Sequence, residues 1–405
     1  MNKCFLKDVA QVDISSVDKK TKENEISIKL CNFTDVYNNW AITKKMYNKF
    51  MNATANKSEI ERYKLKKGMI AITKDSETKE DIGMSTYIAD SFDDVLLGYH
   101  TALIKPNNKV DSKYLNAYLN SYIARKYFSK SASGSGQRYT LAMDIIEKMP
   151  LFLPSLDIQK KIGNLLSDID KKIEINYLIN NNLEELMKII YQRWFIEFEF
   201  PNEEGKPYKS SGGKLVYNNK LKHEVPENWN VNELIEVADI YQPKTIPMND
   251  LKEKGKYNVY GANGIIGKYD FYNHKENEIA VCCRGAGCGK YLMTQPFSWI
   301  TGNAMVVKPK LEYDLKEYIY YKLADKDILN YVTGSAQPQI TRANIEDMKI
   351  IIPDKTIIDK FNEMAKKVRK DIINLIKENQ SLDSLKEYLL PLLMNGQINV
   401  DDIEI

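Results

Sequence analysis

Two stretches of the chain place apolar residues three and four positions apart, which is the spacing of one face of an α-helix. The first series is Ile158, Ile162, Leu165, Ile169, Ile173, Ile179, Leu183, Leu186, Ile190 and Trp194. The second is Phe361, Met364, Val368, Ile372, Leu375, Leu382, Leu385, Leu389 and Leu393. Each series predicts a helix of roughly 50 Å, at about 1.5 Å per residue. A helix this long has few neighbours of its own, so we expect the two to pack against each other, antiparallel.

Three asparagines interrupt these apolar series: Asn176, Asn180 and Asn379. Buried asparagines between paired helices can fix the register at a cost in stability. Solvated positions on slightly curved helices would give the same pattern, and the sequence leaves both alternatives open.

Short runs of β-branched and other apolar residues lie outside the two helical stretches. Examples are residues 69–73 (MIAIT), 278–282 (EIAVC) and 304–307 (AMVV), each bounded by turn-forming residues. Residues 260–267 carry three glycines and are typical of turns between short strands. These segments predict mixed α/β domains.

Landmarks recur along the chain at an offset of about 200 residues. Gly134-Ser-Gly-Gln137 is echoed by Gly334-Ser-Ala-Gln337, and residues 149–154 (MPLFLP) match 348–353 (MKIIIP). Upstream, 103–106 (LIKP) matches 306–309 (VVKP), and a Tyr-rich helical pattern follows each. Because the landmarks keep their order, the chain is interpreted as one unit written twice.

This repeat predicts an α+β fold of two mixed α/β domains separated by a pair of long antiparallel coiled-coil helices, with pseudo-twofold internal symmetry. The domains are expected at residues 1–154 and 226–353, and the helices at 155–200 and 354–394. Residues 201–225 are rich in Gly, Pro, Ser and Lys and predict a linker, and 395–405 form a C-terminal tail.

Composition excludes several classes. No run of 18 apolar residues indicates a membrane span, and the N-terminus lacks the apolar core of a signal peptide. The five cysteines lack the paired spacing of a zinc site or a disulfide framework, so we predict no metal and a cytoplasmic location.

The two predicted domains differ in charge. Residues 1–154 hold 24 basic and 18 acidic side chains, and residues 226–353 hold 15 basic and 16 acidic ones. A basic first domain suits a phosphate backbone, although a lysine-rich solvated surface explains it equally well.

Motifs that suggest catalysis fail on inspection. Residues 285–290 (GAGCGK) resemble a phosphate-binding loop but lack its spacing, and Tyr291 stands where Ser or Thr would hold magnesium. Acidic residues between 75 and 81 alternate with lysines, which favours a solvated loop over a metal site. With three histidines in the chain, no nucleophile, base and acid can be assembled. We therefore assign no catalytic residue and no metal ligand.

Reading a DNA sequence requires Arg, Lys, Asn and Gln side chains that reach base edges, and others that hold phosphates. Loops before the last strand of each copy can present such groups, although each residue alone is more often plain surface. The candidates in the first copy are Lys44, Lys45, Lys74, Ser76, Lys79, Tyr99, His100, Gln137, Arg138 and Tyr139. Those in the second are Lys244, Tyr260, Asn263, Lys268, Arg284, Lys290, Asn303, Gln337, Gln339 and Arg342.

Several segments together resemble the specificity subunit of type I restriction–modification systems, over essentially the whole chain. The entry to the first long helix (residues 153–162), its continuation (168–185) and its exit (194–198) are similar to that family's first conserved helix. Residues 259–267 with 301–304, and 72–78 with 81–83 and 98–100, resemble recurrent patterns of its target recognition domains. The second helix departs from the family at residues 357–361 (IIDKF), which lack the usual Glu-Gln pair. That departure leaves the docking contacts there open.

The resemblance implies a non-catalytic subunit whose two target recognition domains each read one half of a bipartite double-stranded DNA site. The helices would then fix the unread spacer and dock two methyltransferase subunits, which bind S-adenosylmethionine, and motor-nuclease subunits, which use ATP and Mg, would join for cleavage. This chain would bind no cofactor and no membrane. Two alternatives remain: a recognition module of a fused nuclease or methyltransferase, or a coiled-coil scaffold without nucleic acid.

Overall fold

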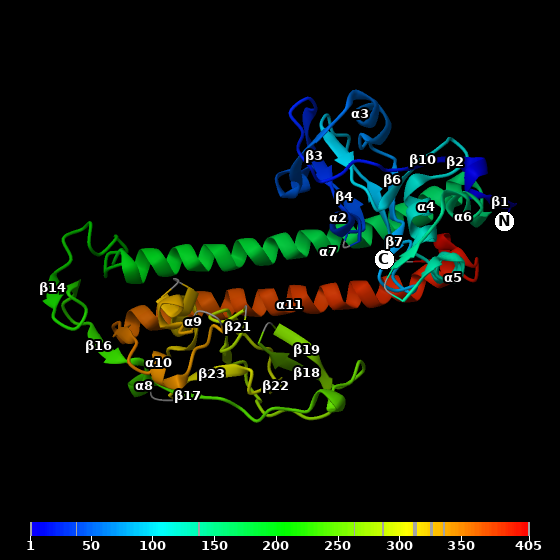
Figure 1. Ribbon diagram of the computed structural model, residues 1–405. Helices are drawn as coiled ribbons and strands as arrows, with labels where there is room; N and C mark the ends of the chain where they lie inside the picture. The colour runs from blue at the N-terminus through cyan, green and yellow to red at the C-terminus, as the bar shows by residue number, and fades with distance from the viewer. Residues whose placement is uncertain are drawn as a thin grey trace. The chain divides into compact units, whose positions relative to one another are not determined.

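The computed structural model describes residues 2–37, 39–136, 138–262, 264–285, 287–310, 314–324, 327–334 and 337–403 (Figure 1). The chain divides into two compact units. Unit 1 consists of Met1–Ile175 with Glu378–Ile405, and unit 2 is Asn176–Lys377. Both long helices run from one unit into the other, so each unit contains part of each helix.

The two long helices are α7 (Leu156–Tyr191) and α11 (Lys355–Met394), coloured green and orange to red in Figure 1. A short π-helical turn, η2 (Gln192–Ile196), continues α7. In unit 1 Asp170 pairs with Lys386, and in unit 2 Glu184 pairs with Arg369. Residue numbers therefore rise along one helix and fall along the other, which confirms the antiparallel pair that the apolar periodicity predicts.

Buried asparagines lie between these helices. Asn176 and Asn379 are 0% and 4% exposed, and Asn379 Nδ2 donates to the Ile173 carbonyl at 3.4 Å. The solvated alternative is therefore wrong for these two positions.

Unit 1 is built on a five-stranded sheet in the order β2-β10-β6-β8-β4, with smaller sheets β5-β3-β9, β11-β12-β7 and β1-β13. Its largest apolar core lies between the five-stranded sheet and helices α4, α5 and α7. The elements are β1 (Asn2–Phe5), α1 (Leu6–Val9), β2 (Ala10–Ile14), β3 (Ile26–Cys31), α2 (Phe33–Tyr37), β4 (Ala41–Ile42), η1 (Lys44–Lys49), β5 (Met51–Ala55), α3 (Lys57–Tyr63), β6 (Ile70–Thr73), β7 (Asp75–Ser76), β8 (Ser85–Ile88), β9 (Val95–Leu97), β10 (Thr101–Pro106), α4 (Ser112–Leu119), α5 (Tyr122–Ser131), β11 (Ser133–Ser135), β12 (Arg138–Thr140), α6 (Met143–Glu147) and β13 (Pro150–Leu153), with η5 (Val400–Asp402) after α11.

Unit 2 contains a four-stranded sheet, β17-β23-β20-β21, a three-stranded sheet, β19-β18-β22, and the pairs β16-β24 and β14-β15. Its core joins the four-stranded sheet to α9 and to the facing sides of α7 and α11. The elements are β14 (Leu215–Asn218), β15 (His223–Pro226), β16 (Asn230–Glu233), α8 (Leu234–Val237), β17 (Ala238–Tyr241), η3 (Met248–Asp250), β18 (Tyr257–Gly261), β19 (Gly264–Tyr269), β20 (Ile279–Cys282), β21 (Tyr291–Met293), β22 (Trp299–Ile300), β23 (Ala304–Pro309), α9 (Lys316–Ala324), η4 (Asp327–Tyr331), α10 (Arg342–Ile345) and β24 (Lys349–Ile352).

The two units repeat one framework. In each, the strand just before a short helix (α1 or α8) pairs antiparallel with the strand before the long helix, β1 with β13 and β16 with β24. In each, a central strand is hydrogen-bonded on both sides, β10 between β2 and β6, and β23 between β17 and β20. The matched motifs LIKP and VVKP lie on these central strands. The fold is therefore mixed α/β with an internal repeat, as the landmarks predict.

The segment expected to be a linker, residues 201–225, is folded. It forms the β14-β15 hairpin, which extends to Pro226, and its Tyr208 ring stacks on Phe200 at 4.5 Å between centroids. Phe200 in turn stacks on Trp229 at 4.8 Å. Aromatic residues without regular spacing hold this segment, so an apolar period could not reveal it. Among the described residues, no helix is long and apolar enough to cross a membrane.

Candidate nucleic-acid interface

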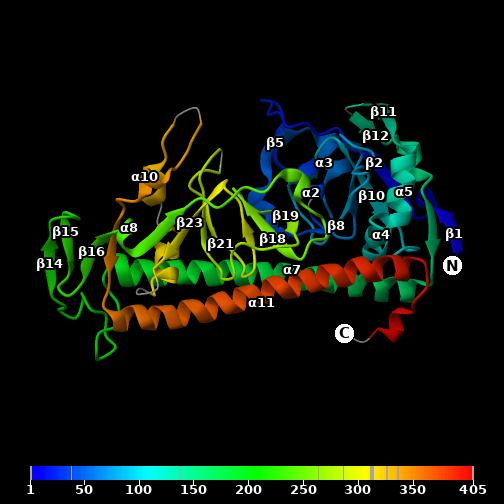
Figure 2. The same ribbon diagram turned by 90° about the horizontal axis from the view of Figure 1, so that it is seen from below.

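In unit 1, three segments far apart in the sequence meet next to the central strand. The backbone N–H of Lys74 donates to the His100 carbonyl at 3.0 Å, and Leu141 N–H donates to the Lys74 carbonyl at 2.7 Å. Strand β12 pairs with β7, so Thr140 lies opposite Asp75. We call this group site 1, made of residues 74–76, 99–100, 133–136 and 138–140. Figure 2 shows its β11-β12 hairpin projecting from the edge of unit 1, clear of α7.

A buried carboxylate organises the side chains of site 1. Asp75 is 7% exposed, and its carboxylate oxygens lie 3.2 Å from Lys74 Nζ. One of them, Oδ2, also lies 2.5 Å from His100 Nδ1 and 3.5 Å from Arg138 Nη2. Burial acts to raise the Asp75 pKa, but hydrogen bonds from Thr140 and His100 and the charge of Lys74 outweigh it and lower the pKa. Asp75 therefore stays ionised and holds three basic groups at one edge of the domain.

His100 has an unusual backbone and a shared nitrogen. Its φ of 70° lies in the left-handed region, which places its ring against Tyr99 at 3.9 Å between centroids. Nδ1 is also 2.8 Å from Arg138 Nη2, but one nitrogen cannot both donate to Asp75 and accept from Arg138. We assign the proton to Nδ1, because a carboxylate can only accept, and Arg138 then contacts Asp75 itself.

An open cavity of about 470 Å³ adjoins this cluster. Asp75, His100 and Arg138 form one wall, and Phe33 and Tyr37 of α2 line it as well. Site 1 therefore offers both charged and aromatic groups to a ligand.

Unit 2 brings the corresponding segments together by the same backbone contacts. Cys283 N–H donates to the Asn303 carbonyl at 3.4 Å, and Ile340 N–H donates to the Cys283 carbonyl at 3.1 Å. Arg284 forms an isolated antiparallel bridge with Gln339, which also pairs with Thr333. We call this group site 2, made of residues 283–285, 302–303, 333–334 and 337–340.

Glycines at matching positions shape both hairpins. Gly134 has φ 143° and Gly334 has φ 84°, and a Cβ at either position would press against a backbone carbonyl, that of Arg138 or of Gln337. Only glycine fits there without a backbone shift. The repeat therefore extends to the need for glycine at these two positions.

The side chains at matching positions differ. Asp75, the residue bridged by the hairpin in site 1, is replaced by the exposed Arg284 in site 2. His100, which precedes β10, is replaced by Asn303, which precedes β23. The framework is shared, and the groups presented to a ligand are not.

Most first-copy candidates gather in or beside site 1: Lys74, Ser76, Tyr99, His100, Arg138 and Tyr139, with Lys79 Nζ lying 5.3 Å from the centre of the Tyr139 ring. Lys44 and Lys45 lie on η1 instead, where Lys45 pairs with Glu174 of α7 at 3.3 Å. Gln137 lies outside the described residues.

Second-copy candidates are more dispersed. Site 2 contains Arg284, Asn303, Gln337 and Gln339, with Lys290 at the end of the adjoining turn and Arg342 at the start of α10. Lys244 lines a separate pocket, and Lys268 lies on β19. Tyr260 is 5% exposed and its hydroxyl accepts from Gln295 N–H, so it packs inside the domain. Asn263 lies outside the described residues.

The sequence candidates omitted Asp75, which connects Lys74, His100 and Arg138. Its position two residues after the buried strand β6 was a usable signal, because side chains there lie at the edge of the sheet. The resemblance of residues 285–290 to a phosphate-binding loop ends here, because they lead from strand β20 into strand β21, not into a helix. No set of three or more His, Cys, Asp or Glu side chains in the described part of the chain is placed to hold a metal.

Comparison with known proteins gives consistent matches. The family model described as "Type I restriction modification DNA specificity domain" matches residues 1–185 and 226–378. The type I restriction enzyme MjaIX specificity subunit of Methanocaldococcus jannaschii is 26% identical over 324 residues, covering 74% of this chain and 72% of that protein. The HindI specificity subunit of Haemophilus influenzae is 23% identical over 410 residues, covering 82% and 87%.

Among solved structures, the S subunit of a type I restriction–modification system from M. genitalium superposes with a TM-score of 0.58. It is 14% identical and the match covers 97% of this chain and 95% of that one. At this identity the match supports the fold.

Proposed function

The chain belongs to the type I restriction–modification DNA specificity family, and from this premise we propose that site 1 and site 2 are its two DNA-reading surfaces. Specificity subunits are the non-catalytic DNA-recognition components of such systems. In this proposal each site contacts one half of a bipartite double-stranded target.

One observation carries the assignment: the same three segments meet in both units through the same backbone hydrogen bonds, while the exposed side chains differ. A duplicated framework with divergent side chains is what two different half-sites require. Arg138 and Arg284 can contact guanine through two hydrogen bonds, and Gln339 can do so with adenine. Lys74, Lys79 and Lys290 suit phosphates, which set position more than sequence.

The long helices supply the second part of the proposal. At about 1.5 Å per residue, the 36 residues of α7 extend roughly 50 Å, about one and a half turns of B-DNA. We therefore expect α7 and α11 to set the length of the unread spacer. This length would be a property of the helices and not of either site.

We also propose that the helices dock two methyltransferase subunits, which bind S-adenosylmethionine. Within unit 2, one side of α7 exposes Leu178, Leu186 and Ile189, which are 39%, 49% and 56% exposed. Apolar side chains repeated along an exposed helix face are typical of a protein interface. Motor-nuclease subunits that use ATP and Mg would join the same assembly, and this chain itself would bind none of these cofactors.

The test measures DNA affinity of the complex assembled with its methyltransferase subunits, by fluorescence anisotropy at several salt concentrations. Arg138→Ala and Arg284→Ala should each weaken binding to the cognate duplex about tenfold or more, since a base-directed arginine is worth about 1–3 kcal/mol. Arg193→Ala is the matched control, because Arg193 is exposed on η2 and belongs to neither site. If both site variants bind like the control, sites 1 and 2 do not contact DNA.

A further inference from the structure

His100 in site 1 is held in place from three sides. Its carbonyl accepts from Lys74 N–H at 3.0 Å, and its ring lies 3.9 Å from that of Tyr99 between centroids. Its Nδ1 lies 2.5 Å from Asp75 Oδ2. The φ of His100, 70°, lies in the left-handed region, which residues other than glycine rarely adopt. Such a conformation persists where surrounding contacts impose it, and positions of this kind cluster at binding sites.

One ring nitrogen of His100 is free for a partner. The Asp75 carboxylate can only accept, so the proton of the neutral ring lies on Nδ1 and Nε2 is left as an acceptor. No hydrogen bond within the described part of the chain uses Nε2, and the side chain is 28% exposed. His100 also lines the open cavity of about 470 Å³ beside site 1. It therefore offers a hydrogen-bond acceptor to a ligand.

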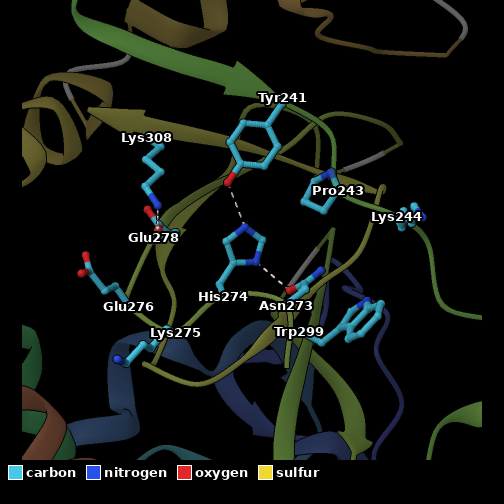
Figure 3. Close-up of a pocket in the computed structure, with 10 residues that line it drawn as sticks. All are labelled: Tyr241, Pro243, Lys244, Asn273, His274, Lys275, Glu276, Glu278, Trp299 and Lys308. Atoms are coloured by element: carbon cyan, nitrogen blue, oxygen red, sulfur yellow. Dashed lines mark hydrogen bonds and ion pairs between the residues drawn. The ribbon is translucent and has the colours of Figure 1, made fainter. Parts of the chain in front are cut away.

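The buried histidine of unit 2 behaves differently. His274 lies at the wall of a pocket, where its Nε2 is 3.0 Å from the Tyr241 hydroxyl and its Nδ1 is 2.6 Å from Asn273 Oδ1 (Figure 3). Both of its ring nitrogens are taken by the protein, as expected for a histidine that only stabilises the fold. His100 differs because it has one nitrogen held and one open.

Arg138 places hydrogen-bond donors beside this acceptor. Its Nη2 lies 2.8 Å from His100 Nδ1 and 3.5 Å from Asp75 Oδ2. No hydrogen bond between residues that the structure describes uses Nε or Nη1 of Arg138, and its side chain is 64% exposed. The guanidinium group is therefore held at one nitrogen and can donate with the others.

The carboxylate of Asp75 is not required for the backbone framework. In site 2 the corresponding backbone hydrogen bonds join the three segments, and Arg284 stands in the place of Asp75. What Asp75 does in site 1 is hold side chains, of which His100 and Arg138 line the open cavity. Its role is therefore sought in what those two side chains contact.

We propose that Asp75 is a positioning residue for base recognition, and that His100 and Arg138 together read one G·C base pair in the half-site of unit 1. The inference rests on the proposed function of site 1. In the major groove a G·C pair presents two acceptors, guanine N7 and O6, and one donor, the N4 amino group of cytosine. Arg138 donates to both acceptors, and His100 Nε2 accepts from the amino group. Asp75 sets the tautomer that makes Nε2 an acceptor.

An A·T pair is a poorer match for the same side chains. Its major-groove edge runs from an acceptor to a donor to an acceptor, with the thymine methyl group beside them. The second donor of Arg138 would then meet the adenine amino group. Two donors followed by an acceptor therefore favour G·C over A·T.

The test uses the chain in complex with its methyltransferase subunits, and duplexes that lack single groups. Mapping of the methylated sequence first identifies the position that Arg138→Ala relaxes, which we expect to be a G·C pair. At that position 7-deazaguanine removes the N7 acceptor, and pyrimidin-2-one in place of cytosine removes the N4 amino group. Loss of N7 should weaken wild-type binding about tenfold, and loss of the amino group about threefold to tenfold.

Each loss should depend on the side chain that makes the contact. With Arg138→Ala, 7-deazaguanine should change affinity less than about twofold, and with His100→Ala the same should hold for pyrimidin-2-one. Asp75→Asn should also remove the pyrimidin-2-one effect, because an amide accepts either tautomer of His100. Each comparison uses one protein on two duplexes, so a variant that is less stable overall still gives a valid result.

Glu77→Gln is the matched control for charge. Glu77 is exposed and lines the same cavity, so its substitution also removes a negative charge close to the DNA. Glu77→Gln should keep the wild-type responses to both modified bases, whereas Asp75→Asn should lose one of them. Equal responses in these two variants would overturn the role of Asp75.

Two outcomes separate this inference from the proposed function. An A·T pair at the position that Arg138→Ala relaxes, or a pyrimidin-2-one effect that persists in His100→Ala, would overturn the inference and leave site 1 as a DNA-reading surface. No relaxation at any position by Arg138→Ala would overturn the proposed function of site 1, and this inference with it.

Discussion

Units 1 and 2 share a backbone framework but differ in how their buried charges are paired. In unit 1, buried carboxylates gather cations: Asp13 holds Lys105 and Arg62, and Asp75 holds Lys74, His100 and Arg138. In unit 2, one buried cation gathers two carboxylates. Arg369 is 8% exposed and pairs with Glu184 at 2.7 Å and Glu317 at 2.9 Å.

The difference shows that the backbone of each unit sets positions, and that the side chains determine what is recognised there. Backbone hydrogen bonds at site 1 and site 2 coincide, so they fix where a side chain stands. The side chain that stands there can reverse its charge, as from Asp75 to Arg284, without changing the framework. Two reading surfaces can therefore diverge while the scaffold that positions them stays constant.

The largest expected effect is a loss of stability confined to unit 2. Arg369→Leu leaves Glu184 and Glu317 without their cation, and removing one partner of a buried pair costs about 3–5 kcal/mol. Hydrogen exchange of the full chain should show the loss in peptides of unit 2, while unit 1 core strands keep their protection. Lys366→Leu is the control, because its ion pair with Asp314 is exposed on both sides and should matter by less than about 1 kcal/mol. Similar losses of stability in the two variants would contradict the prediction that the buried Arg369 matters more than an exposed ion pair.

The matching contact in unit 1 should respond to pH. Lys386 pairs with Asp170 at 2.7 Å and lies 3.6 Å from the centre of the Trp40 ring. Burial raises the Asp170 pKa and the charge of Lys386 partly offsets it, so Lys386→Leu raises that pKa further. The ionised buried carboxylate then costs stability at neutral pH, about 2 kcal/mol.

That cost should shrink as pH falls, because Asp170 takes up a proton in the folded state above its unfolded pKa of about 3.9. Urea unfolding at pH 7.5 and pH 5 measures this difference. An equal penalty at both values would show that Asp170 does not titrate in this window.

A smaller effect concerns the hairpins. Gly134→Ala and Gly334→Ala each force a Cβ against a carbonyl at positive φ, which should cost about 1–3 kcal/mol locally. Each variant should weaken DNA binding through its own site only. Gly136→Ala is the control for backbone strain alone, since its φ of 68° also disfavours alanine but a Cβ there has no atom of the described residues within 4 Å. Loss of binding in the control as well would place the effect in loop conformation generally and not in the matched glycines.

The framework could be predicted from the sequence because periodic apolar residues and repeated motifs determine it. Helices α7 and α11 follow from apolar spacing, and the repeat follows from LIKP, VVKP and the Gly-Ser loops. The sites depend on contacts between distant residues, which single segments do not reveal. Asp75 meets Arg138, 63 positions away, only after the hairpin folds onto β7.

Tyr260 was predicted to be a DNA-contacting residue, but its side chain is buried. Its loop-rich neighbourhood indicates an exposed residue, but a register shift between Val259 and Tyr260 in the pairing with β19 accompanies a buried side chain. A bulge of this kind changes which face a residue lies on, and composition does not encode it.

The central claim, two independent reading surfaces, is tested most directly by mapping the methylated sequence of the assembled complex for wild type, Arg138→Ala and Arg284→Ala. We predict a target of two blocks separated by a gap of unread bases, with Arg138→Ala relaxing one block and Arg284→Ala the other, and the gap unchanged in both. A single continuous target, or relaxation of the same block by both variants, would contradict this account.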